Sequence, residues 1–333
     1  MTDRARPRCG SQARALQWSA VIEVEGLTKH YGERTAVRDL TFSVPRGQVM
    51  GFLGPNGAGK STTMRMLTGF ISASGGHASI AGFDIFSESL EVRRRVGYLP
   101  ELAPLYAEMR VDDYLALMCK LRGVPRRLRK QRIEYAIEAC GLQTRHRDII
   151  GRLSKGLRQR VGLAQAVVHD PDVLILDEPT AGLDPGQTRE TRELIVTLGR
   201  QHTVILSSHI LPEVAATCER VVIINQGRLV ADDTPSNLAA HLSEQRGEEV
   251  ELVVRGEEAR IRTQLGSVPG VSSVEFHTLA GNEYRVVVTS TGEDLREELA
   301  GAIVGGGLGL RELRSHTLSL EDVFLQLTTE EVA

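Results

Sequence analysis

The chain has 333 residues, of which 41% are hydrophobic and 25% are charged, and its formal net charge is -3. This composition is typical of a globular protein of about two domains, and it excludes a fibrous or disordered chain. The near-neutral charge excludes a global positive field that would attract nucleic acid or anionic lipid. The longest apolar runs are only a few residues long, whereas a membrane-spanning helix needs about 20, so we expect no membrane span in this chain.

The first segment, residues 1–20, is rich in arginine but lacks the apolar core of about 7–15 residues that a secretory signal needs. It therefore predicts a disordered basic extension. The four cysteines of the chain are widely spaced and form no Cys-x-x-Cys pair, which argues against structural zinc and thiol exchange. We expect them to be reduced cytosolic thiols.

An α/β domain is predicted over residues 21–242. Short apolar runs separated by longer helical patterns are typical of buried strands in a largely parallel sheet with helices on its faces. Between about residues 102 and 152 the pattern is helical throughout, which predicts a helical subdomain inserted in the α/β core. The expected strands are Gln48–Leu53, Val173–Leu176, Thr203–Leu206 and Val221–Asn225, and the clearest inserted helices are Val111–Leu121 and Ile133–Cys140.

A smaller second domain is predicted over residues 250–333, after a polar linker at residues 243–249. Its patterns follow the order βαββαβ, which indicates a ferredoxin-like α+β accessory domain. A last helix is expected near Leu320–Leu327. The expected elements are the strand Glu251–Val254, the helix Ala259–Leu265, the hairpin strands Val271–Thr278 and Tyr284–Thr289, the helix Glu293–Ile303 and the strand Leu310–Ser315.

A glycine-rich segment follows the apolar strand Gln48–Leu53 and opens a helical pattern. It matches G-x-x-x-x-G-K-[ST], the phosphate-binding P-loop, in the strand-to-helix setting that this motif requires. Glycines let backbone N–H groups converge on phosphate oxygens at the positive end of the new helix. Lys60 is expected to reach the β- and γ-phosphates, and Ser61 to bind magnesium. The expected nucleotide-binding residues are Gly54, Pro55, Asn56, Gly57, Ala58, Gly59, Lys60, Ser61 and Thr62.

Two carboxylates end the buried strand Val173–Leu176, where packing needs no acidic side chain. Asp177, at the tip of this strand, is placed to hold magnesium directly or through water. Glu178 is the candidate general base that polarises the water attacking the γ-phosphate. Taken alone, the two acids could equally cap the next helix; the P-loop upstream favours the nucleotide site.

The segment Leu153-Ser154-Lys155-Gly156-Leu157 lies just before the carboxylate strand. The order of P-loop, Leu-Ser-x-Gly signature and Asp-Glu strand resembles the ATP-binding cassette (ABC) ATPases. This resemblance covers Val21 to about Pro235 and implies ATP and Mg²⁺ as ligands. It further implies that Tyr31 stacks on adenine and that His209 is a catalytic switch histidine.

In ABC ATPases two cassettes enclose two ATP molecules head to tail, so the resemblance implies a homodimer. The signature of one subunit would complete the P-loop site of the other. Lys155 and Leu157 depart from the usual Leu-Ser-Gly-Gly-Gln, and Glu101 stands where the family usually has Gln. Glu101 could still meet magnesium or the attacking water through a carboxylate oxygen. The residues expected to act across the dimer are Leu153, Ser154, Lys155, Gly156 and, from the D-loop, Asp184.

The tail Ser319–Leu325, after the βαββαβ unit, is similar to that of ATPase subunits of type-2 bacterial exporters for drugs, sodium and gliding motility. The resemblance implies an ATP hydrolase that drives a separate multi-span permease from the cytoplasmic side of the membrane. The segment Glu101–Tyr114 is the candidate permease contact. The basic run Arg122–Arg132 is expected to be a solvated helical face, with a contact to anionic lipid or a partner as the lesser alternative.

The alternative function is a non-transport ABC ATPase that acts on nucleic acid or ribosomes. Such relatives usually carry coiled-coil arms, zinc modules or two cassettes, whereas this chain has one P-loop, no Cys-x-x-Cys and no sustained heptad. We therefore expect no nucleic-acid partner. A regulatory module with a dead site conflicts with the intact Lys60, Asp177, Glu178 and His209.

Overall fold

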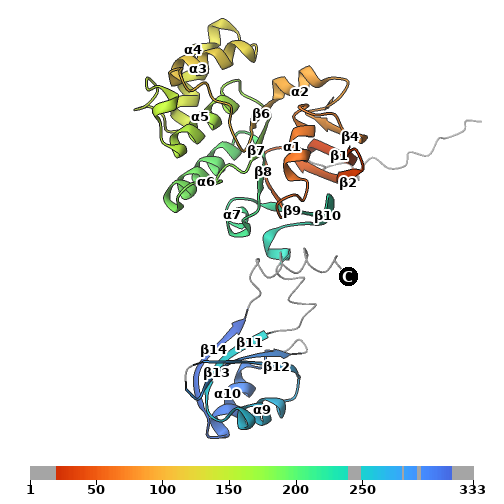
Figure 1. Cartoon of the computed structure of the whole chain (residues 1–333), viewed down its shortest axis with the longest axis vertical. Coiled ribbons are helices and arrows are strands. Elements are labelled where there is room, and N and C mark those ends of the chain that lie inside the picture. The colour runs from red at the N-terminus through yellow and green to blue at the C-terminus, as the bar shows by residue number, and fades with distance from the viewer. Residues whose placement is uncertain (1–19, 239–248, 280, 291–293, 317–333) are drawn as a thin grey trace, which may run out of the picture. The chain divides into compact units, whose positions relative to one another are not determined.

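The computed structural model describes residues 20–238, 249–279, 281–290 and 294–316 (Figure 1). They fall into two compact units, and the chain divides between Asp232 and Asp233, upstream of the boundary at residue 242 expected from the sequence. The expected basic extension before Ala20, the expected linker up to residue 248 and the helix expected near Leu320–Leu327 lie outside the described residues. Among the described residues, no helix combines the length and apolar character that crossing a bilayer requires.

A six-stranded sheet forms the centre of the first unit, with strand order β10-β9-β3-β8-β7-β6. The pairs β6–β7, β7–β8, β8–β3 and β3–β9 are parallel, which confirms the predicted parallel sheet. All residues of β3, β7 and β8 are buried, because strands covered on both faces need continuous apolar runs. The strands are β3 (Val49–Leu53), β6 (Val96–Leu99), β7 (Val173–Asp177), β8 (Thr203–Ser208), β9 (Arg220–Asn225) and β10 (Arg228–Asp233).

A second, antiparallel sheet in this unit was not predicted. Its order is β2-β1-β4-β5. The β1–β2 register shifts several times, including between Val24 and Leu27, and Gly26 between them has a φ of +61°. Bulges of this kind break the alternation of apolar and polar residues that indicates a strand. The strands are β1 (Ala20–Tyr31), β2 (Arg34–Pro45), β4 (Gly75–Ile80) and β5 (Phe83–Asp84).

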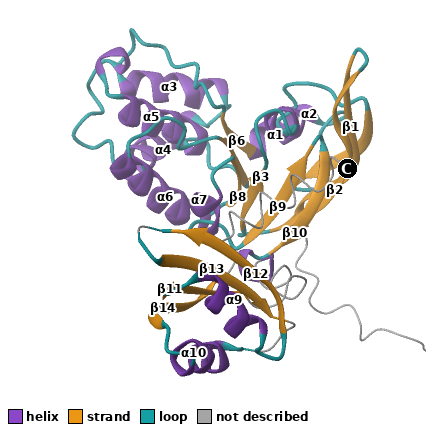
Figure 2. Cartoon of the chain, turned by 60° about the horizontal axis from the view of Figure 1, so that its bottom comes forward, coloured by secondary structure: helices purple, strands orange, loops and turns teal. Residues whose placement is uncertain are grey.

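Helices α3 to α5 lie on one side of the parallel strands and the antiparallel sheet lies on the other (Figures 1 and 2). The helical subdomain was expected to end near residue 152, yet α5 begins at Lys155 and contacts both α3 and α4. The helices of the first unit are α1 (Lys60–Leu67), α2 (Ser89–Arg95), α3 (Val111–Leu121), α4 (Arg126–Ala139), the 3₁₀ turn η1 (Ile150–Arg152), α5 (Lys155–Val167), α6 (Pro185–Gly199) and α7 (Leu211–Ala215).

The second unit has the element order β11-α9-β12-β13-α10-β14, as the sequence predicts. Its sheet is antiparallel, with strand order β12-β13-β11-β14. Alternate residues of β11, Val250, Leu252 and Val254, are buried in one core with Ile261 and Leu265 of α9. β11 begins at Glu249, the last residue of the expected linker. The elements are β11 (Glu249–Arg255), α9 (Glu258–Gly266), β12 (Val271–Thr278), β13 (Glu283–Ser290), α10 (Arg296–Gly305) and β14 (Gly309–His316).

Candidate active site

The P-loop, residues 54–61, connects the buried strand β3 to α1. A Cβ atom at Gly54 would lie 2.5 Å from the Ile224 carbonyl oxygen, and one at Gly59 would lie 2.6 Å from that of Ala36. Gly59 also has a φ of +108°, in the region that side chains rarely adopt. Glycine is therefore required at both positions for the loop to pack against its neighbours and direct its N–H groups outward at the start of α1.

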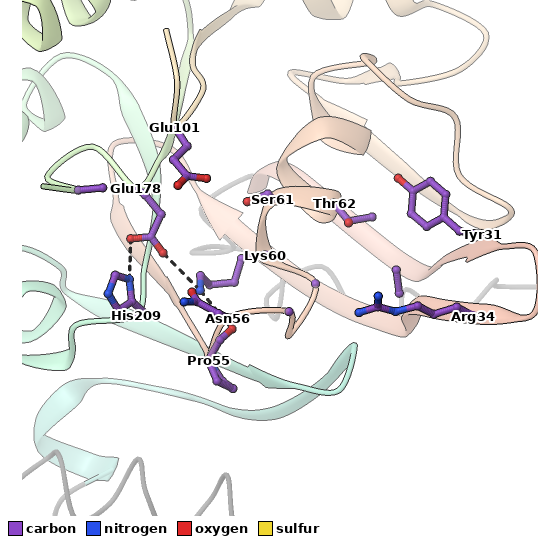
Figure 3. Close-up of a pocket in the computed structure, with 14 residues that line it drawn as sticks. Tyr31, Arg34, Pro55, Asn56, Lys60, Ser61, Thr62, Glu101, Glu178 and His209 are labelled. Carbon is purple, nitrogen blue, oxygen red and sulfur yellow. Dashed lines mark hydrogen bonds and ion pairs between the residues drawn. The ribbon is translucent and has the colours of Figure 1, made fainter.

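Lys60 lies inside this loop and is only 6% exposed. Its Nζ donates to the carbonyl oxygens of Gly54 at 2.7 Å and Pro55 at 3.3 Å. The same Nζ lies 3.3 Å from Glu178 Oε1, as Figure 3 shows. The ammonium group is thus held between the loop and a carboxylate, in a position where phosphate oxygens would compete for it.

Asp177 and Ser61 bring two oxygen ligands together at the start of α1. Ser61 Oγ donates to Asp177 Oδ1 at 3.1 Å, and Ser207 Oγ donates to the same oxygen at 2.6 Å. No cluster of three or more His, Cys, Asp or Glu side chains suited to a metal occurs in the described part of the chain. The donor set still fits Mg²⁺, which prefers oxygen and usually completes its coordination with substrate phosphates and water.

Glu178 follows Asp177 in a left-handed backbone conformation, with a φ of +48°. Its N–H donates to Ser207 Oγ at 2.9 Å, which holds the strained turn in place. A non-glycine residue in this conformation costs on the order of 1 kcal/mol. The turn directs the carboxylate between Lys60 and His209, whose Nδ1 lies 3.0 Å from Glu178 Oε2 (Figure 3).

Lys60, Ser61, Glu178 and His209 line one cavity of about 550 Å³. The Tyr31 ring, 48% exposed, lies on one side of the P-loop, and Glu178 and His209 lie on the other (Figure 3). An elongated ligand can therefore contact an aromatic ring at one end and carboxylates at the other. The expected residues that line the cavity are Tyr31, Pro55, Asn56, Gly57, Gly59, Lys60, Ser61, Thr62, Glu101, Glu178 and His209.

Three lining residues, Arg34, Ala36 and Ala181, were missed by the sequence analysis. Arg34 is paired with Tyr31 across the β1–β2 hairpin, so a hairpin prediction there would have brought it to the site. Gly54, Ala58 and Asp177, although expected at the site, do not line the cavity. Ala58 and Asp177 are buried, and Asp177 reaches the site through Ser61.

The signature residues do not line the cavity of their own chain. Ser154 caps α5 by accepting from the Leu157 N–H at 3.3 Å, and Asp184 caps α6 by accepting from the Gln187 N–H at 2.9 Å. A Cβ atom at Gly156 would lie 2.7 Å from the Gln187 side-chain oxygen, so the two helix starts pack together. Leu153 is buried beside this cap, and the first helical residue of α5 is Lys155. Ser154, Lys155 and Asp184 are exposed and form a signature surface apart from the P-loop cavity.

Known proteins that are similar to this chain are named as ATP-binding proteins, in agreement with the P-loop and carboxylate site described above. Residues 37–181 match the family described as ABC transporter. The chain is 39% identical over 216 residues to the bacitracin transport ATP-binding protein BcrA of Bacillus licheniformis, covering 64% of this chain and 70% of that protein. It is 33% identical to the Nod factor export ATP-binding protein I of Burkholderia lata, covering 94% and 98%.

The fold is also found among solved structures. An ATP-binding subunit of an ABC transporter superposes with a TM-score of 0.61 at 29% identity, covering 67% of this chain and 93% of that one. The match to the family and the near full-length relative extend over the P-loop and the carboxylate strand. The chain therefore belongs to the ABC transporter family, and it is an ATP-hydrolysing, nucleotide-binding subunit of such a transporter.

Proposed function

We propose that two copies of this chain close on ATP and drive a separate multi-span permease in export, from the cytoplasmic side of the membrane. The observation that carries the proposal is the near full-length similarity to a protein named for Nod factor export. The separation of the signature surface from the P-loop cavity supports the dimer. Because the signature completes the nucleotide site in the ABC family, a chain that holds the signature and the P-loop on different surfaces needs a second cassette to complete the site, and a second copy of the chain supplies one.

In the proposed complex, Tyr31 stacks on adenine and the P-loop N–H groups with Lys60 bind the phosphates. Ser61 and Asp177 would hold Mg²⁺, and Glu101, which lines the same cavity as Ser61, would contribute a carboxylate oxygen. When bound, Mg²⁺ neutralises charge on the β- and γ-phosphates. The Lys60 contact with Glu178 is given up when the ammonium turns to the phosphates, which leaves the Glu178 carboxylate available to water.

Hydrolysis then depends on Glu178 and His209. The carboxylate accepts a proton from the water that attacks the γ-phosphate. His209 holds one carboxylate oxygen at 3.0 Å and so keeps the other directed into the cavity. Ser154 and the start of α5, supplied by the second copy, offer a hydroxyl and helix N–H groups to the γ-phosphate. Lys155 adds a positive charge beside it, and Asp184 braces the signature surface. Phosphate release removes these contacts and opens the dimer.

The segment Glu101–Tyr114 is the proposed permease contact. Leu102 is 86% exposed and Tyr106 is 45% exposed. Large apolar side chains at a surface mark interaction sites, because a partner that covers them removes them from water. Because this segment begins at Glu101 in the ATP cavity, closure of the site can move the contact. A tagged chain should therefore retain a multi-span membrane protein on purification, and recovery of nuclease-protected nucleic acid alone would contradict the proposal.

A mixed dimer tests whether the signature acts across the interface. Lys60→Ala removes the phosphate contact, and Ser154→Arg blocks the signature surface, so each variant alone should be inactive. In a mixed dimer one site combines both defects and the other has neither. An equal mixture should regain about a quarter of wild-type ATPase activity, since half of the dimers are mixed and each has one intact site.

The matched control for this mixture is a chain that carries both substitutions. Mixed with the Lys60→Ala chain, it offers no intact P-loop, and activity should stay at the level of the separate variants. Steady-state phosphate release measures all the mixtures. If the two single variants mix freely, as native mass spectrometry would report, and yet regain no activity, the signature does not act in trans.

A further inference from the structure

A strongly basic surface lies where α3 ends and α4 begins, in the helical region that Figures 1 and 2 show away from β8. Residues 121–132 contain six arginines or lysines and no aspartate or glutamate, although the whole chain has a net charge of -3. At physiological salt, charges more than about 8 Å apart are largely screened from one another. A partner that touches this junction therefore meets a positive surface, whatever the net charge of the chain.

The turn between the two helices leaves two leucines at the surface. Gly123 adopts a φ of +72°, and the Val124 N–H donates to the Cys119 carbonyl oxygen at 2.9 Å, which ends α3. Val124 then packs inward and is buried, as is usual for the residue after such a glycine. Leu121, the last residue of α3, is instead 67% exposed, and Leu128, in the first turn of α4, is 36% exposed. The basic junction thus also carries apolar side chains in contact with water.

Three of the cations at this junction are available to an external anion. Arg132 pairs with Asp170, whereas Arg126 and Arg127 are exposed and form no ion pair within the described ranges. Lys130 is 89% exposed and lies 3.9 Å from a carboxylate four residues further along α4. An exposed pair of this kind contributes little. We call Arg126, Arg127 and Lys130, with the two exposed leucines, the basic patch.

The cations of the basic patch stand at an unfavourable end of their helix. Arg126 and Arg127 open α4, and its first turn contains no acidic residue. The positive end of the helix dipole lies there, so cations at this end cost stability and an anion restores it. Pro125, the N-cap residue, has no side-chain acceptor for the first N–H groups. A phosphate group at this end would supply the negative charge that the sequence does not.

The carboxylates of α4 confine the basic patch to the start of the helix. Arg126 and Lys130 line a groove along α4 whose other lining residues include Glu134 and Glu138. These two acids lie one and two turns beyond Lys130, and an anionic surface would repel them. An anionic partner would therefore contact the first two turns of α4 and not the whole length of the helix.

We infer that the basic patch binds the anionic phospholipid headgroups of the membrane surface. The inference rests on the proposed function, which brings the chain to the cytoplasmic face of a membrane. Each Lys or Arg close to an anionic leaflet strengthens binding about fivefold, and exposed leucines can enter the headgroup layer beside them. Nucleic acid would attract the same charges, but it offers no apolar layer to Leu121 and Leu128.

Flotation of the purified full-length chain with lipid vesicles tests this inference. Phosphatidylcholine vesicles that contain about 30% phosphatidylglycerol should bind the chain at physiological salt, and vesicles of phosphatidylcholine alone should not. The triple variant Arg126→Gln, Arg127→Gln, Lys130→Gln should bind the anionic vesicles about 100-fold more weakly, because three charges are lost. Its basal ATPase activity should equal that of the wild type, which shows that the variant folds.

Three further variants separate a membrane contact from other anion contacts. Arg126→Lys with Arg127→Lys should keep vesicle binding, because a lipid surface responds to charge and needs no bidentate fork. Leu121→Ser with Leu128→Ser should weaken vesicle binding about tenfold, and it should leave any binding to duplex DNA unchanged. The matched control removes three exposed arginines outside the basic patch and should bind vesicles nearly as the wild type does; it is Arg189→Gln, Arg228→Gln, Arg255→Gln.

Several results would overturn the inference. They are equal binding to neutral and anionic vesicles, no binding to either, a triple variant that binds as tightly as the control, and vesicle binding that the leucine substitutions do not change. Vesicle binding needs no permease, so it is measured apart from the proposed function. Retention of a multi-span membrane protein by the unmodified tagged chain would then show that the proposed function stands and that only the lipid contact fails. Loss of that retention would reject the proposed function itself.

Discussion

Glu178→Gln should lower the turnover number for ATP hydrolysis by about 10²- to 10⁴-fold, the contribution expected of a general base. The amide keeps the size of the side chain and one oxygen acceptor, but it cannot take a proton from water. It also removes the carboxylate that holds Lys60 at 3.3 Å, so the ammonium remains available to phosphates. ATP affinity should therefore be retained or increased, and the dimer should persist in ATP.

Steady-state phosphate release and size-exclusion chromatography in ATP measure the two effects of Glu178→Gln. Glu190→Gln is a suitable control, since this carboxylate lies on α6, pairs with Arg160 and does not line the cavity. It should hydrolyse ATP at the wild-type rate. If Glu178→Gln hydrolysed ATP as fast as the wild type, Glu178 would not be the base.

Lys60→Ala should weaken ATP binding about 10- to 100-fold. Hydrogen bonds from a charged donor contribute about 1.5–3 kcal/mol, and Lys60 is the cation placed at the P-loop with its Nζ already directed into the site. Isothermal titration with ATP and Mg²⁺ measures the loss. Lys120→Ala, an exposed lysine on α3, is the matched control and should bind ATP as the wild type does.

Lys60→Ala should also destabilise the nucleotide-free protein, because Glu178 is 8% exposed and would lose its cationic partner. The double variant Lys60→Ala, Glu178→Gln should recover part of that loss in a thermal melt, since neither charge remains. Additive destabilisation by the two substitutions would show that the pair is not coupled. Unchanged ATP affinity in Lys60→Ala would exclude Lys60 from the phosphate site.

The sequence predicted those parts of the site that are built from residues adjacent in the chain. The P-loop carries its glycines, lysine and serine in one run, and Asp177 and Glu178 directly follow an apolar strand. The distances from Lys60 to Glu178 and from Ser61 to Asp177 confirm that these segments meet. Arg34 and Ala36 were missed because they reach the site through the β1–β2 hairpin, whose bulged strands do not alternate regularly.

The same limit applies to the antiparallel sheet and to α5. Sequence periodicity reports which face of an element is apolar, but pairing partners separated by many residues are chosen by packing. Thus β1 pairs with β4 as well as with β2. The inserted helices were predicted up to residue 152, and α5 joins them because its buried face packs on α3 and α4.

By itself, the sequence determined the buried apolar strands of a largely parallel sheet, the phosphate-binding loop, the acidic strand end and a second βαββαβ unit, because each shows in residues that lie close together in the chain. Tertiary structure alone decided which charges are neutralised. Of the consecutive arginines Arg93 to Arg95, two meet carboxylates and one faces a cavity. It also decided that the signature lies on a surface apart from the P-loop of its own chain. Such relations depend on distances through space, and contacts between remote segments set those distances.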